Sequence, residues 1–179
     1  MHISFINYSI ELQSWEDKQS MMLFLTTCEN GHLLFEEEYQ QQFHSVTVFL
    51  DHSRSNRLGI GVCAEKHGLV PQLLLQPEHS RLVLGFNSVI VGIRVPVGEL
   101  DFRLNLDSLF YSFWPLYDKN ILLVIHEIGV LALSPSGQIL WSFSRDVITK
   151  VDVIEDRIQL EFIDSPSINL NVVNGSVEL

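Results

Sequence analysis

The chain has 179 residues and a formal net charge of −11, with 22 acidic residues against 11 lysines and arginines. A chain of this length buries enough apolar surface to fold as one domain without a disulfide framework or a structural metal. The acidic balance disfavours binding to nucleic acid or to an anionic membrane, because their phosphates would be repelled. We therefore expect a protein partner, with no nucleic acid and no membrane among the partners.

The N-terminal region carries the clearest helical signal. Residues Ser14 to Met22 predict a short helix, with Ser14 as N-cap and the acids Glu16 and Asp17 in its first turn. Further along, Asn30-Gly31 separates two apolar runs, a pattern typical of a hairpin turn. A second polar run, at 36–43, is compatible with a helical turn or a loop. The sequence therefore predicts one or two short helices.

The cysteines and the N-terminus indicate a compartment. Cys28 and Cys63 form no CxxC pair and are too few for a disulfide framework, so we expect reduced thiols. The opening residues lack the basic region and the long apolar run of a signal peptide. Both observations favour a cytoplasmic protein.

Charge is distributed unevenly along the chain. Residues 1–51 hold eight acids against one base, Lys18, whereas the rest of the chain holds fourteen acids and ten bases. The run Glu36, Glu37 and Glu38 is typical of a solvated face and is also a candidate binding surface for a basic partner. Residues 51–57 are the best linker candidate. We predict a single domain, 1–179, with an acidic part at 1–51 and a repeat-bearing part at 58–179.

An internal repeat dominates the second part of the chain. Residues 87–109 align without a gap on residues 126–148, a spacing of about 39 residues. The aligned pairs are Pro96 with Pro135, Gly98 with Gly137, Leu100 with Ile139, Phe102 with Trp141, Leu104 with Phe143, and Asp107 with Asp146. Each copy reads as strand, turn, strand, because apolar and polar residues alternate with period two on both sides of the turn. We expect the apolar residues of the second strand, among them Leu100 and Ile139, to point into the core.

The turn and strand at Gly137–Trp141 (GQILW) resemble the end of a blade in quinoprotein-type β-propellers. The resemblance covers two units, about 80 residues, and residues 58–77 are a candidate for a degenerate third. A closed propeller needs at least about four blades. The resemblance therefore implies blade-like hairpins, and the predicted fold class is mainly β: an antiparallel meander of consecutive hairpins that is not a full propeller.

One aromatic segment stands out after the first repeat. It contains Phe110, Tyr111, Phe113, Trp114 and Tyr117. Aromatic side chains anchor both cores and protein interfaces, and they also stack on sugars. All three interpretations stay open, and the function prediction uses the protein-binding one.

Motifs that carry chemistry are missing from the sequence. There is no GxSxG elbow and no P-loop, and Gly59-Ile60-Gly61 is typical of a bulge or a tight position in a strand. Cys63 and His67 lack the further ligands of a zinc site, and His126 is expected at the rim of a sheet or in a turn. Asp51 with His52 could act as acid and base. We assign no catalytic residue, no metal site and no cofactor.

The function predicted from these observations is a non-catalytic protein-interaction module, such as an acidic inhibitor or immunity protein for a basic protein. Its candidate binding residues are Glu36–Glu38 and the five aromatic residues named above. The alternative is an enzyme or a small-ligand-binding β domain with a pocket near His52, His67 and His79. The absence of catalytic motifs makes the binding module the favoured prediction.

Overall fold

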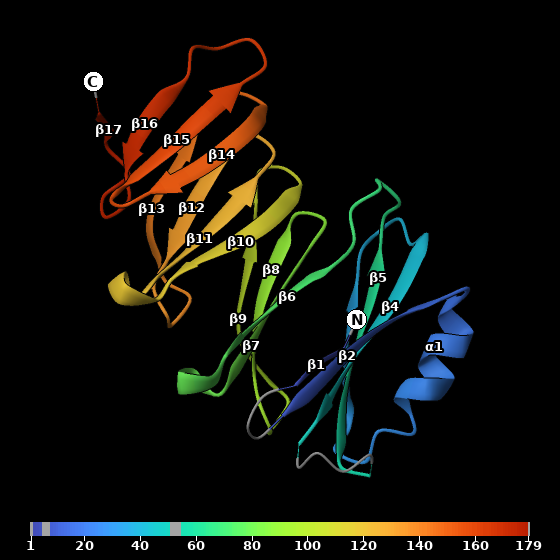
Figure 1. The fold of residues 1–179 in the computed structure, drawn as a ribbon. Helices are drawn as coiled ribbons and strands as arrows, with labels where there is room; N and C mark the ends of the chain where they lie inside the picture. The colour runs from blue at the N-terminus through green and yellow to red at the C-terminus, as the bar shows by residue number, and fades with distance from the viewer. Residues whose placement is uncertain (1, 5–7, 51–54, 179) are drawn as a thin grey trace. The chain divides into compact units, whose positions relative to one another are not determined.

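The computed structural model of the chain describes residues 2–4, 8–50 and 55–178 (Figure 1). Its contacts divide the chain into two compact units. The N-terminal unit comprises Met1–Pro71, Leu75–Leu82 and Ile93–Asp101, and the C-terminal unit comprises Gln72–Leu74, Val83–Gly92 and Phe102–Leu179. This division does not test whether the chain is one domain, which stays a prediction.

Within the described ranges, the strands form four sheets and the chain is mainly β, which confirms the predicted fold class. The first sheet has five strands in the order β1-β2-β4-β5-β3. Its strands are β1 (His2–Ser4), β2 (Ser9–Trp15), β3 (His32–Glu36), β4 (Gln42–Phe49) and β5 (Arg57–Ala64). Neighbours pair antiparallel except β3 and β5, which run parallel. A parallel pair needs a longer connection than a hairpin turn, and the connection from β3 to β5 runs through β4.

Helix α1 (Lys18–Leu25) packs on this sheet (Figure 1). Its buried residues Met21 and Leu25 cluster with Cys63 of β5. The helix comes close to β5 because Gly59 and Gly61 lack side chains: a Cβ at Gly61 would lie 2.7 Å from Leu25 Cδ1. The Gly-Ile-Gly motif therefore makes room for a helix, a role consistent with the tight strand position that the sequence predicts.

Three local predictions for this region were wrong. The helix begins at Lys18 with Asp17 as its N-cap, and Ser14 lies in β2. Asn30-Gly31 does not join two strands of a hairpin, because α1 precedes it and β3 follows it. The linker candidate 51–57 joins β4 to β5, which are adjacent antiparallel strands of one sheet, and Leu50 N–H donates to Asn56 O at its base (2.9 Å). Residues 51–54 themselves lie outside the described part.

The remaining three sheets have four strands each, ordered as they occur in the chain. The sheet β6–β9 contains β6 (Gln72–Gln76), β7 (Arg81–Phe86), β8 (Val89–Arg94) and β9 (Glu99–Asn105). The sheet β10–β13 contains β10 (Phe110–Leu116), β11 (Ile121–His126), β12 (Gly129–Leu133) and β13 (Ile139–Ser144). The sheet β14–β17 contains β14 (Ile148–Ile154), β15 (Arg157–Phe162), β16 (Ile168–Asn171) and β17 (Val177–Glu178). Short 3₁₀ turns, η1 (Pro77–His79) and η2 (Tyr117–Lys119), follow β6 and β10. Each sheet is a four-stranded antiparallel meander, the architecture of one propeller blade.

The repeat extends to a third copy that the sequence comparison missed. The turn before the last strand of each sheet contains a glycine with positive φ: Gly98 (70°), Gly137 (81°) and Gly175 (69°). An L-residue is strained in this region, so glycine marks the turn in all three copies. The third unit is thus β14–β17, and the expected degenerate unit at 58–77 was wrong, because those residues form most of β5 and all of β6.

Two of these glycines, Gly137 and Gly175, also allow close packing in the C-terminal unit. A Cβ at Gly137 would lie 2.2 Å from Phe102, and one at Gly175 would lie 2.6 Å from Trp141. Phe102 and Trp141 are aligned in the sequence repeat, so the aromatic side chain of one copy packs on the turn glycine of the next. The aligned aromatic and glycine positions form one recurring contact.

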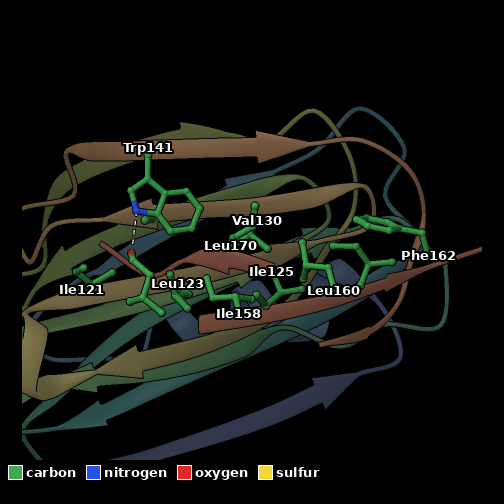
Figure 2. Packing of buried hydrophobic residues seen from close by; sticks show 12 residues of the cluster. Ile121, Leu123, Ile125, Val130, Trp141, Ile158, Leu160, Phe162 and Leu170 are labelled. Carbon is green, nitrogen blue, oxygen red and sulfur yellow. Dashed lines mark hydrogen bonds between the residues drawn. The ribbon is translucent and has the colours of Figure 1, made fainter. Parts of the chain in front are cut away.

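The central strands of the sheet β10–β13, β11 and β12, are buried on both faces. One side of β11 and β12, with Leu122 and Leu131, joins a core with Val83 and Ile90. The other side, with Leu123 and Val130, joins a core with residues of β15 and β16. Figure 2 shows Trp141 beside this second core, where its indole N–H donates to Val172 O at 2.9 Å. Burial on both faces explains why Ile121–Ile125 is a continuous apolar run and does not alternate.

Period-two alternation placed two residues wrongly. Leu100 is 46% exposed and Ile139 is 56% exposed, although both were expected in the core. Both lie within the first two residues of the last strand of their sheet, and the packing begins further along, where Trp141 is buried and Phe102 is half-buried. Alternation identifies the face of a strand but not how far the opposite layer extends along it.

The sheet β14–β17 is apolar on one face only. Ile158, Leu160 and Leu170 point into the core. On the other face, Lys150 lies 2.6 Å from Asp152, and Arg157 lies 2.8 Å from Glu178. A terminal repeat with a polar outer face ends the stacking of apolar layers. The C-terminal unit is therefore capped at this sheet.

Candidate protein-binding surfaces

The register of the first sheet brings acidic residues together at one end. Trp15, Phe43, Cys63 and Glu36 form one row across β2, β4, β5 and β3. Because β2, β5 and β3 run in the same direction, the chain leaves all three strands at this end. The acids that flank these strand ends, here called the acidic end, are Glu16, Asp17, Glu36, Glu37, Glu38 and Glu65.

Within the acidic end, the three predicted glutamates have different environments. Glu36, the last residue of β3, is exposed and pairs with Lys18 at the start of α1. Glu37 is half-buried, and its backbone N–H donates to Cys63 O at 3.1 Å. Glu38 is exposed in the loop between β3 and β4. The run therefore contributes one ion pair, one partly buried side chain and one exposed carboxylate.

Asp17 at the acidic end is a charged helix cap. Its carboxylate accepts hydrogen bonds from the backbone N–H and the hydroxyl of Ser20, both at 2.8 Å. The backbone bond, followed by the hydroxyl bond, holds the pKa of Asp17 below its ordinary value. Asp17 therefore stays ionised at neutral pH. It caps α1 and adds to the negative charge of this end.

Tyr39 adjoins the acidic end in the sequence and is 64% exposed. It follows Glu38 directly in the loop between β3 and β4. Tyrosine is enriched at protein interfaces because it offers a large rigid surface with a hydroxyl. The sequence analysis did not select Tyr39. It did not select Glu16 or Glu65 as binding residues either, because only the parallel order of the strand ends relates these two acids to Glu38.

The aromatic segment does not form a single surface. Phe110 is 2% exposed and packs on Phe113, with ring centroids 4.6 Å apart. Tyr111 points to the opposite core, and burial raises the pKa of its phenol. Trp114 and Tyr117 are 38% and 70% exposed. Neighbouring strand residues such as Phe110 and Tyr111 point to opposite faces, and the bulge between Phe110 and Ser112 brings Phe113 to the same side as Phe110. Binding of a partner by these residues stays a prediction.

The histidines of the alternative function are placed as follows. His67 is half-buried in the loop after β5, and Leu69 N–H donates to its Nδ1 at 3.4 Å. His79 is exposed on η1, while Asp51 and His52 lie outside the described residues. Among the described residues, no three His, Cys, Asp or Glu side chains gather as metal ligands would.

Two buried histidines each contact a serine. His44 Nδ1 lies 3.0 Å from Ser14 Oγ, and His126 Nδ1 lies 2.8 Å from Ser108 Oγ. His126 is only 4% exposed at the end of β11, so it sits at a strand end, as predicted, but in the interior. Ser108 Oγ also accepts a hydrogen bond from Ile128 N–H at 3.3 Å. Burial lowers the pKa of both histidines. These pairs hold strands and turns in place.

Comparisons with known proteins find structures of similar fold but indicate no function. No family model matches the chain, and no curated protein matches it. The chain is similar to the crystal structure of the computationally designed Ika8 protein, with a TM-score of 0.53 and 15% identity. The match covers 98% of this chain and 59% of the designed one. A match to the designed Ika4 protein has a TM-score of 0.49 and 12% identity over 79% of this chain and 89% of that chain. Identities this low show the fold alone.

No helix in the described part is both long enough and apolar enough to cross a membrane.

Proposed function

We propose that this chain is a non-catalytic, cytoplasmic protein-interaction module whose acidic end binds a basic partner protein, in the manner of an inhibitor or immunity protein. The observation that carries the proposal is the convergence of six acids at one end of the first sheet, with the exposed Tyr39 directly after Glu38. An acidic surface steers a cationic partner toward it, and a central aromatic side chain anchors the complex once formed.

The charge balance supports the proposal. The acidic end has two nearby bases, Lys18 and Lys66, and Lys18 is already engaged by Glu36. Elsewhere in the N-terminal unit, Arg57 lies 3.1 Å from Glu29, so that pair is also neutralised. Glu16, Asp17, Glu38 and Glu65 therefore dominate the field at this end.

The first experiment locates the contact. A photo-crosslinking amino acid replaces Tyr39 in one variant and Tyr117 in a matched control, because the two tyrosines have similar exposure, 64% and 70%. Crosslinking in cells that produce the full chain, followed by mass spectrometry, should give one dominant basic protein from position 39. A dominant product from position 117 alone would overturn the proposal in favour of the aromatic segment.

The second experiment tests the electrostatic part with the purified crosslinked partner. The variant E16Q/E38Q/E65Q removes three charges from the acidic end. A control, D107N/E155Q/D164N, removes three exposed charges from the C-terminal unit. Stopped-flow association at low salt should be slower by on the order of tenfold for the first variant, and the difference should vanish at high salt. Equal effects of the two variants would show that net charge alone matters and would refute a local site.

A further inference from the structure

The outer edge of β13 is unprotected against pairing with another strand. It ends the sheet order β10-β11-β12-β13, and it pairs with β12. In an antiparallel pair, alternate backbone groups of an edge strand point away from its neighbour. Ile139 and Leu140, at the start of β13, are 56% and 48% exposed. An apolar edge with outward backbone groups is a template for another strand.

The equivalent strands of the other repeats are protected. β9 carries Glu99, Asp101 and Arg103, and β17 has only 2 residues. Charges and short length are the usual ways in which proteins block edge pairing. β13 has 6 residues (ILWSFS) with neither a charge nor a proline. The sequence repeat aligns Leu140 with Asp101, so the charge present in one copy is missing in the next.

Other edge strands of these sheets lack this combination. β10 contains Pro115, and β14 carries Lys150 and Asp152 on its polar face. β6 (QLLLQ) is also uncharged, but its leucines are half-buried or buried. β13 is therefore the edge on which length, neutrality and exposed apolar side chains coincide.

We infer that β13 pairs antiparallel with β13 of a second copy of this chain, forming a two-fold dimer with a continuous sheet. Charge favours this place of contact: two chains of net charge −11 repel each other, so two copies meet with least repulsion where no acid lies, and residues 128–145 contain none. A two-fold contact uses the same segment on both copies, so a single neutral strand is sufficient. This inference is independent of the acidic end.

The test measures the mass of the wild-type chain by analytical ultracentrifugation from about 1 to 500 µM. We expect a reversible monomer–dimer equilibrium. Leu140→Asp, which copies the aligned residue of β9, should raise the dissociation constant at least about tenfold, because each dimer then holds two added negative charges at the paired edge. Leu140→Val should leave dimerisation intact. Circular dichroism checks the fold of each variant.

Leu100→Asp is the matched control, since Leu100 is 46% exposed on β9 and the substitution adds the same charge. It should weaken dimerisation far less than Leu140→Asp. A wild-type chain that stays monomeric throughout the range would overturn the inference. So would equal effects of the two substitutions, or polydisperse association, which would show open-ended aggregation and not a two-fold pair. If Leu140→Asp unfolds the chain, concentration-dependent hydrogen exchange of the wild type decides: the inference requires added protection at 139–144.

Discussion

Gly175 and Trp141 provide the sharpest test of the repeated glycine–aromatic contact. Replacing Gly175 by alanine should destabilise the C-terminal unit for two separate reasons. Its φ of +69° places the residue in the left-handed region, which costs an L-residue about 1–2 kcal/mol. The new Cβ would also meet Trp141 Cε3 at 2.6 Å. Because the indole is held by its hydrogen bond to Val172 O, the ring cannot move freely, and overpacking adds about 1–3 kcal/mol.

A double-mutant cycle separates the two contributions. Trp141→Ala alone should cost about 3–5 kcal/mol, since the side chain is 9% exposed and fills the core. In that background, Gly175→Ala should cost only the backbone part, about 1–2 kcal/mol, because no ring remains to collide with. The coupling between the two substitutions should therefore be about 1–3 kcal/mol.

The assay is urea denaturation followed by far-UV circular dichroism, with separate transitions fitted if the two units unfold independently. Gly31→Ala is the control for the backbone part: its φ is +79°, and a Cβ there would meet nothing within 4 Å. It should cost about 1–2 kcal/mol. A coupling near zero, with Gly175→Ala no more costly than Gly31→Ala, would refute the packing of the indole on this turn.

Further predictions concern other parts of the chain. Gly61→Ala should destabilise the N-terminal unit by about 1–3 kcal/mol through collision with Leu25, measured by urea denaturation; an unchanged midpoint would contradict the close helix approach. Burial lowers the pKa of His126 below 6.5 in the folded chain, so its contribution to the free energy of unfolding should be fully present above pH 6.5 and should fall as the pH decreases below that value. His126→Asn should flatten this pH dependence, and an equal pH dependence of the free energy of unfolding in both proteins would exclude His126 as its source. Burial raises the pKa of the free thiols Cys28 and Cys63, so a thiol reagent should modify the folded chain at least about tenfold more slowly than the urea-unfolded chain, whereas equal rates would show that the thiols are accessible.

The candidate site was predictable in part. The sequence identified the acidic N-terminal part and the run Glu36–Glu38, because charge is a property of composition. It could not relate Glu16 or Glu65 to Glu38, since these residues follow different strands. Their proximity depends on β3 lying parallel to β5. The sequence predicted a hairpin at Asn30-Gly31 instead, whereas helix α1 precedes these residues in the structure. Likewise, the aromatic segment looked uniform in the sequence, but strand alternation divides Phe110 and Tyr111 between two cores, and the bulge in β10 keeps Phe113 with Phe110.

The sequence by itself determined that the chain is mainly β and repetitive. Alternation with period two and the recurring turn at Gly98 and Gly137 are local properties, so they can be seen without neighbours. Tertiary structure decided the rest. The third repeat keeps Gly175 but few aligned side chains, because its outer face is polar where β10–β13 is buried on both sides. Burial depends on which layer lies opposite a strand, and no single strand carries that information.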